Sequence, residues 1–119
     1  MEATELEQLK TSIYMELHGY ISFKAQQTEL EKKDALEIGA FVGADFITRI
    51  NDSKADGHIS KDELSSVMNL LLEFFKDSFK NQFEQRDADA MIGLLGRIIQ
   101  NTEERREIID NYLKKLLPK

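Results

Sequence analysis

The chain of 119 residues contains a single proline, Pro118, which is its next-to-last residue. Proline interrupts a helix because it lacks the amide hydrogen and its ring collides with the preceding turn. Ahead of it, apolar residues recur at spacings of three and four along most of the chain, which places them on one face of successive helices. The sequence therefore predicts an all-α protein.

This pattern predicts one compact bundle of about five helices, so that residues 1–119 form a single domain. Gly19 either ends the first helix or only kinks it, and in the second case the bundle has four helices. An almost wholly polar segment, residues 26–34, is the best candidate for a linker. The segments with helical spacing are 3–17, 35–50, 64–83, 91–99 and 101–117. Of these, residues 64–83 are expected to form the longest and most buried helix.

Three predicted helices begin with polar side chains of the kinds that cap helices. These side chains satisfy backbone amides that have no partner inside the helix. The candidate caps are Thr4 with Glu7, Asp87 or Asp89, and Asn101 with Glu104. The last two helices are expected to form a C-terminal pair over about residues 87–117.

The net charge is -6, and the whole acidic excess lies within residues 1–83. A nucleic-acid backbone requires a clustered excess of Lys and Arg, so we expect no nucleic-acid partner. No stretch is long and apolar enough to span a bilayer, and the first residues do not resemble a secretory signal. Cysteine is absent, which excludes disulfides and thiolate chemistry. These features predict an intracellular protein, most simply a cytoplasmic one.

Residues 52–63 form an acidic turn between two of the predicted helices. With Gly57 as the sixth residue of a twelve-residue loop, Asp52, Asp56 and Glu63 fall at the first, fifth and twelfth positions. Over about residues 36–75 the chain thus resembles the EF-hand family, in which two helices flank a calcium-binding loop. The resemblance implies a bundle built on an EF-hand-like pair.

The same resemblance implies a set of calcium ligands. The third position holds Lys54 in place of an oxygen ligand, so the loop is degenerate and calcium binding is expected to be weak or absent. No other cofactor is implied. The implied ligands are Asp52, Asp56, the backbone carbonyl of His58, Ser60 and Glu63.

A purely structural interpretation accounts for the same residues. Gly57 supplies a positive φ in an ordinary turn, and Ser60 with Glu63 forms a capping box that opens the next helix. The segment 55–60 with Glu63 also resembles the helix-turn-helix units of the tellurite-resistance TerB-like helical domains. On the structural interpretation, no residue of the turn binds a metal.

The second half of the chain is rich in Phe and Met, whose adaptable side chains line many helix-binding surfaces. No nucleophile elbow, phosphate-binding loop or zinc motif is present, so we expect no enzyme. The favoured hypothesis is a non-enzymatic protein–protein interaction module, and a homo-oligomer also fits. The alternative is a calcium-responsive sensor or buffer. The candidate partner-binding residues are Met68, Leu71, Phe75, Phe79 and Met91.

Overall fold

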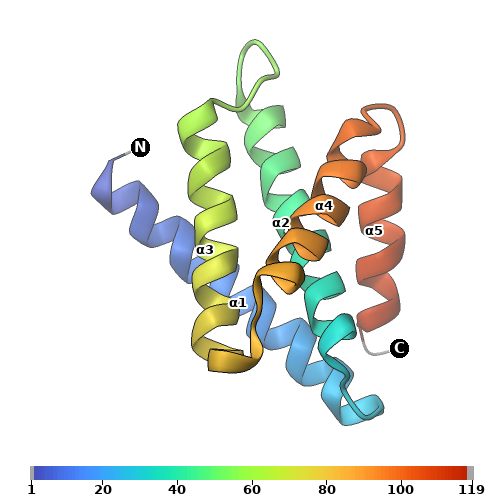
Figure 1. Cartoon of the computed structure of the whole chain (residues 1–119). Coiled ribbons are helices and arrows are strands. Elements are labelled where there is room, and N and C mark those ends of the chain that lie inside the picture. The colour runs from blue at the N-terminus through green and yellow to red at the C-terminus, as the bar shows by residue number, and fades with distance from the viewer. Residues whose placement is uncertain (1, 118–119) are drawn as a thin grey trace.

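The computed structural model describes residues 2–117, which form five α-helices and one 3-10 turn (Figure 1). The all-α bundle predicted from the sequence is confirmed, and the described residues contain no strand. None of the helices within this range is long and apolar enough to cross a membrane. The elements are α1 (Ala3–Gln27), α2 (Lys32–Ser53), α3 (Lys61–Phe79), the 3-10 turn η1 (Lys80–Gln82), α4 (Gln85–Gln100) and α5 (Arg105–Leu116).

Helix α2 is the centre of the bundle, because it packs against each of the other four helices. From Ala35 to Thr48 its residues are buried apart from Glu37 and Phe41. The expectation that residues 64–83 form the longest and most buried helix is therefore wrong: α1 is the longest and α2 the most buried. Alanine and glycine at five positions make α2 slender enough to be surrounded.

Two glycines of α2 lie against core side chains of α3 and α4. A Cβ atom added at Gly39 would lie 2.5 Å from the Phe75 ring and 2.7 Å from the Met91 sulfur. One added at Gly43 would lie 2.5 Å from a Leu71 methyl and 2.6 Å from a Leu95 methyl. The core side chains of α3 and α4 thus occupy the space that larger residues on α2 would fill. These contacts explain why small residues stand at both positions of α2.

Helix α1 runs without a break through Gly19, so this glycine does not end the first helix. The described residues nevertheless form five helices, so the count of four expected in that case is wrong. The connection between α1 and α2 lies inside the predicted linker, residues 26–34, but spans only residues 28–31. Glu2 is the N-cap residue of α1 and makes no side-chain capping bond, so the capping box expected from Thr4 and Glu7 is wrong.

The predicted N-cap of α4 is also wrong, because Glu84 takes that position. Asp87 lies in the first turn instead, where its carboxylate accepts a hydrogen bond from the Glu84 amide at 2.9 Å. The same carboxylate pairs with Lys32 of α2 at 3.1 Å. Before α5, Asn101 accepts a hydrogen bond from the Glu104 amide as expected, although the helix itself begins at Arg105.

The contact at Gly39 predicts that Gly39→Ala destabilises the protein. The added methyl group collides with the fully buried Phe75 ring, which costs about 1–3 kcal/mol, whereas the better helix propensity of alanine returns only about 1 kcal/mol. Urea unfolding followed by circular dichroism measures the difference.

Gly93→Ala on α4 is the matched control, because no atom lies within 4 Å of the added Cβ. This variant should be as stable as the wild type or up to about 1 kcal/mol more stable. Equal effects of the two substitutions would contradict the packing described at Gly39.

Candidate functional site

The acidic turn lies where the sequence places it, with α2 ending at Ser53 and α3 beginning at Lys61. Gly57 has a φ of 72°, as both interpretations of the turn require. Its amide donates to the Lys54 carbonyl at 3.1 Å, and the Asp56 carboxylate accepts a hydrogen bond from the His58 amide at 3.1 Å. The turn is therefore held by its own backbone and by the Asp56 side chain.

The Glu63 carboxylate is fully engaged. One oxygen accepts hydrogen bonds from the Ser60 amide at 3.2 Å and the Ser60 hydroxyl at 2.8 Å, and the other pairs with the Lys54 ammonium at 2.8 Å. The Glu63 amide donates back to Ser60 Oγ at 3.1 Å, which completes the predicted capping box. The Lys54 hydrogen bond, aided by Ser60 and opposed by burial, lowers the pKa of Glu63 below its ordinary value of 4.5.

The candidate calcium ligands are spread along the turn. Asp52 belongs to the last turn of α2 and is exposed, and Asp56, His58 and Ser60 are exposed in the loop. Within residues 2–117, no three Asp, Glu, His or Cys side chains are grouped so that they could hold a metal ion. Calcium binding by this turn stays a prediction.

Sequence reasoning missed Asn51, which anchors the turn to the bundle. Its buried side chain accepts a hydrogen bond from the Ile59 amide at 2.5 Å. Asn51 immediately precedes the acidic segment, where a polar residue at the end of an apolar helix face is the signal that would have identified it. The turn is thereby fixed at both of its ends.

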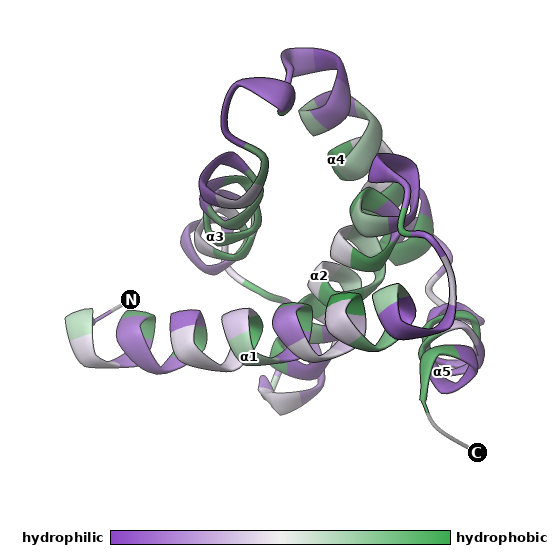
Figure 2. Ribbon diagram, turned by 90° about the horizontal axis from the view of Figure 1, so that it is seen from below, coloured by the Kyte–Doolittle hydropathy of each residue, from purple (hydrophilic) through white to green (hydrophobic). Residues whose placement is uncertain are grey.

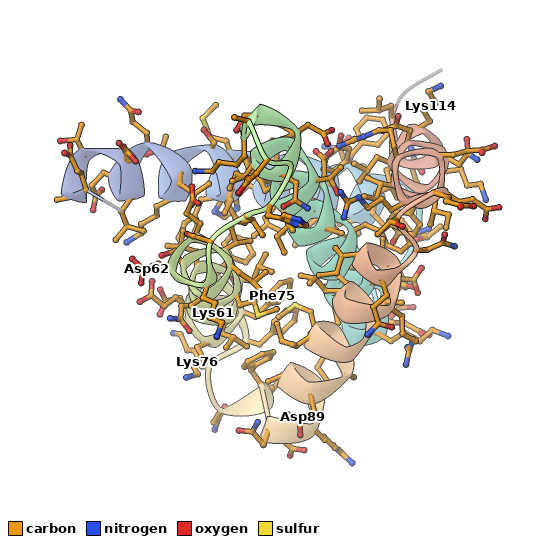
Figure 3. All side chains as sticks on the ribbon, turned by 90° about the horizontal axis from the view of Figure 1, so that it is seen from above. Lys61, Asp62, Phe75, Lys76, Asp89 and Lys114 are labelled. Carbon is orange, nitrogen blue, oxygen red and sulfur yellow. The ribbon has the colours of Figure 1, made fainter. Side chains whose placement is uncertain are left out.

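The five candidate partner-binding residues come together between α3, α4 and α2, but three of them are not at the surface. Leu71 and Phe75 are completely buried and Met91 is 1% exposed, because they fill the space beside Gly39 and Gly43. Figure 3 shows Phe75 directed inward between α3 and α4. Met68 and Phe79 lie partly buried at the margin of this cluster. The face that was expected to receive a partner is mainly core.

The large apolar side chains that do remain exposed within residues 2–117 lie on α1 or beside it. Leu6 is 37% exposed and Met15 is 69% exposed, both on α1. Leu117, which is 49% exposed, follows α5 and borders a hollow formed with the second half of α1. Helix α1 is thus the element whose apolar surface is least covered.

The first turns of α1 project beyond α3, as Figure 2 shows. All residues from Glu2 to Gln8 are exposed. Leu6 and Leu9 nevertheless continue, at helical spacing, the apolar stripe that Ile13 and Leu17 bury in the core. We call residues 2–9 the α1 overhang.

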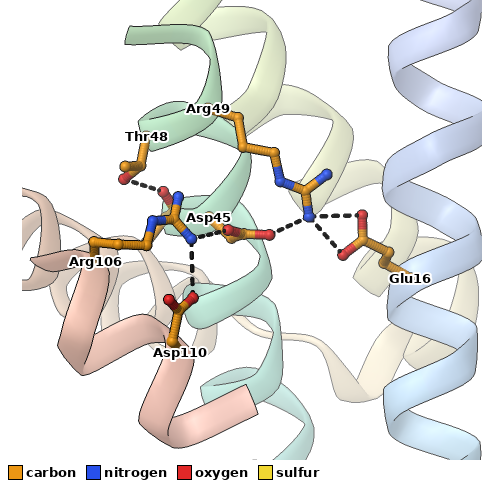
Figure 4. A network of polar contacts seen from close by, with 7 residues as sticks. Glu16, Asp45, Thr48, Arg49, Arg106 and Asp110 are labelled. Atoms are coloured by element: carbon orange, nitrogen blue, oxygen red, sulfur yellow. Dashed lines mark hydrogen bonds and ion pairs between the residues drawn. The ribbon is translucent and has the colours of Figure 1, made fainter. Parts of the chain in front are cut away.

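A second feature absent from the sequence predictions is a charge network built on Asp45 of α2, drawn in Figure 4. Asp45 is 3% exposed. One of its oxygens accepts from Arg106 of α5 at 2.7 Å, and the other pairs with Arg49 one turn along α2. Arg49 also binds Glu16 of α1 at 3.1 Å, and Arg106 binds Asp110 at 3.0 Å. The network joins α1, α2 and α5.

The ion pairs of the network keep its arginine side chains charged although these are partly buried. Burial disfavours the charged guanidinium groups, yet hydrogen bonds and charge from Asp45 raise the pKa of Arg49 and of Arg106. Burial raises the pKa of Glu16, although its pairing with Arg49 acts in the opposite direction. The sequence did contain a signal for this network: Asp45 is an acidic residue inside the apolar run from Ala40 to Ile47. A carboxylate buried in such a run requires a cationic partner.

Comparison of the chain with models of protein families, with curated proteins and with solved structures gave no match. 

The Lys54–Glu63 pair predicts a pH-dependent contribution to stability. Because the pKa of Glu63 is lowered in the folded protein, its stabilising effect is present above pH 4.5 and is lost as the pH falls through the lowered pKa. Glu63→Gln should therefore cost about 0.2–1 kcal/mol at neutral pH and progressively less in acid. Urea unfolding at a series of pH values measures this difference.

Lys54→Gln removes the other member of the pair and should weaken the same acid-sensitive contribution. A cost of Glu63→Gln that stays constant from neutral to acidic pH would contradict the role given to the ion pair.

The degenerate third position predicts that Lys54→Asp creates or strengthens a calcium site. The substitution releases Glu63 from its ion pair and supplies a fourth carboxylate, at the third position of the loop, and the number and charge of the ligands set the calcium affinity of such loops. We expect binding at least about tenfold tighter than in the wild type, measured by NMR titration of the Gly57 amide.

Lys61→Asp makes the same change of charge at a position that is not an implied ligand, and should leave calcium binding nearly unchanged. If neither variant gives a saturable shift at Gly57, the turn lacks the geometry of a calcium loop.

Proposed function

We propose that the chain is a non-enzymatic helical module that binds a protein partner through the α1 overhang. The partner segment is amphipathic and basic. The proposal requires no metal or cofactor, and places the interaction inside the cell, most simply in the cytoplasm. The observation that carries it is the apolar stripe of α1, which continues past the end of the bundle.

The exposed part of this stripe supports a docking role. Leu6 and Leu9 extend the same face that Ile13 and Leu17 bury against the core. Burial of an apolar face supplies most of the stability of a helix in a protein, and short helical segments are marginal alone. A partner that covers Leu6 would extend the core along α1.

The charges around the stripe support a basic partner. Glu2, Glu5 and Glu7 are exposed on the overhang, and the first basic residue of the chain is Lys10. The Lys10 ammonium lies over the Tyr14 ring, 5.5 Å from its centroid, and is thus directed away from the first turns. Complementary charge steers association and selects partners. A second copy of this chain, paired symmetrically through the overhang, would place the same acidic residues opposite each other.

A photo-crosslinking amino acid introduced at Leu6 tests the proposal in cells that contain the natural partner. We expect one discrete crosslinked protein, whose attached segment has Lys or Arg on one helical face and apolar residues on the other. The yield should fall when Glu5 and Glu7 are both replaced by Gln, because charge pairing with the partner is then lost.

The same amino acid at Thr4 is the matched control, since Thr4 is also exposed on the overhang but lies on the opposite side of the helix from Leu6. Equal crosslinking from both positions, no crosslink at Leu6, or a crosslink only to a second copy of the chain would contradict the proposed function.

A further inference from the structure

Two adjoining hollows lie between the second half of α1 and the end of α5, and they are independent of the α1 overhang. Each has a volume of about 290 Å³, and they share Tyr20 and Leu117 as lining residues. One hollow is mainly apolar and the other contains the charged side chains of the Asp45 network. Because they share these two residues the hollows adjoin, and we call the pair the depression, with an apolar end and a polar end.

The apolar end is lined mainly by Phe23, Leu116 and Leu117. Gly19 borders it as well, and a Cβ atom added there would meet no atom within 4 Å. The absence of a side chain at this position therefore leaves open space next to Phe23. An aliphatic chain is the kind of group that gains from covering such a surface.

The polar end presents hydrogen-bond donors. Arg49, Arg106 and Lys114 line it, and the Asp45 carboxylate beneath them is 4% exposed and has both oxygens engaged. Arg49 donates through Nη2 alone to side chains within residues 2–117, and Arg106 through Nη1 alone. Each guanidinium carries five N–H donors, so most of them stay available to a ligand.

We propose that this depression binds a small aliphatic carboxylic acid, with the carboxylate at Arg49, Arg106 and Lys114 and the chain against Phe23 and Leu116. A guanidinium matches the geometry of a carboxylate with two parallel hydrogen bonds. Three cationic and two acidic side chains line the polar hollow, and Glu16, which pairs with Arg49, lines the apolar one. The ligand carboxylate is therefore held by hydrogen-bond donors and not by a net positive charge of the depression as a whole.

Tyr20 stands between the two ends and defines where the head of the ligand gives way to its tail. Burial, together with the nearby Glu16 and Asp45 carboxylates, raises the pKa of the Tyr20 hydroxyl. The hydroxyl thus stays protonated and remains a donor at neutral pH, while its ring continues the apolar wall.

The test is an NMR titration of the full chain with octanoate in the millimolar range, read at the Gly19 and Leu117 amides. Saturable shifts at both amides are expected. Octanol has the same chain without the charge, and should bind roughly tenfold more weakly or worse, because charge-assisted hydrogen bonds are lost. Equal binding of octanol and octanoate, or no saturable shift at these amides, would overturn the proposal.

Two glycine variants locate the ligand. Gly19→Leu fills the apolar end and should weaken octanoate binding about tenfold or more. Gly93→Leu, also at an open helical position but on α4, should leave binding unchanged. If both variants bind like the wild type, the apolar end does not hold the chain of the ligand.

Two further measurements keep the test decisive. Lys114→Gln changes an exposed side chain and should weaken octanoate but not octanol, whereas equal effects on both ligands would contradict the placement of the carboxylate. Sedimentation with anionic phospholipid vesicles is the second. Binding to vesicles without binding to octanoate would assign the depression to a membrane surface and overturn the proposal.

Discussion

The bundle depends on the close approach of α3 and α4 to the glycines of α2. Gly39 and Gly43 leave room for Phe75, Met91, Leu71 and Leu95, which form much of the core around that helix. In Figure 2, the ribbons of α3 and α4 stand well apart. It is their side chains that reach the two glycines of α2. Because these large side chains are used in the core, the exposed apolar surface is left to α1 and the end of α5.

The positions of the helices could be predicted because they follow from local spacing. The continuity of α1 through Gly19 could not, since one glycine in a helix costs only about 1 kcal/mol and neighbouring contacts decide the outcome. The burial of α2 and the pairing of Asp45 with Arg106 depend on contacts between segments distant in the chain. Periodicity says which face of a helix is apolar, but it does not say which helix will be surrounded.

The acidic turn illustrates why a motif alone leaves two interpretations. Ser60 and Glu63 are the residues that a helix start requires and also the residues that a calcium loop requires at those positions. In the structure, Glu63 is engaged by Ser60 and Lys54. A metal ion would have to displace these contacts, so the stability of the helix start and any affinity for calcium are in competition.

The glycine contacts also determine how the three helices are aligned along their axes. Gly39 and Gly43 are four residues apart, as are the side chains they receive: Leu71 and Phe75 on α3, and Met91 and Leu95 on α4. Sliding α2 by four residues, about 6 Å, would bring one glycine into the place of the other. The second place would then receive Ala35 or Ile47, and either side chain would be too large for it. Because α2 has glycine at these two positions and no third glycine four residues before or after them, the bundle has a single register.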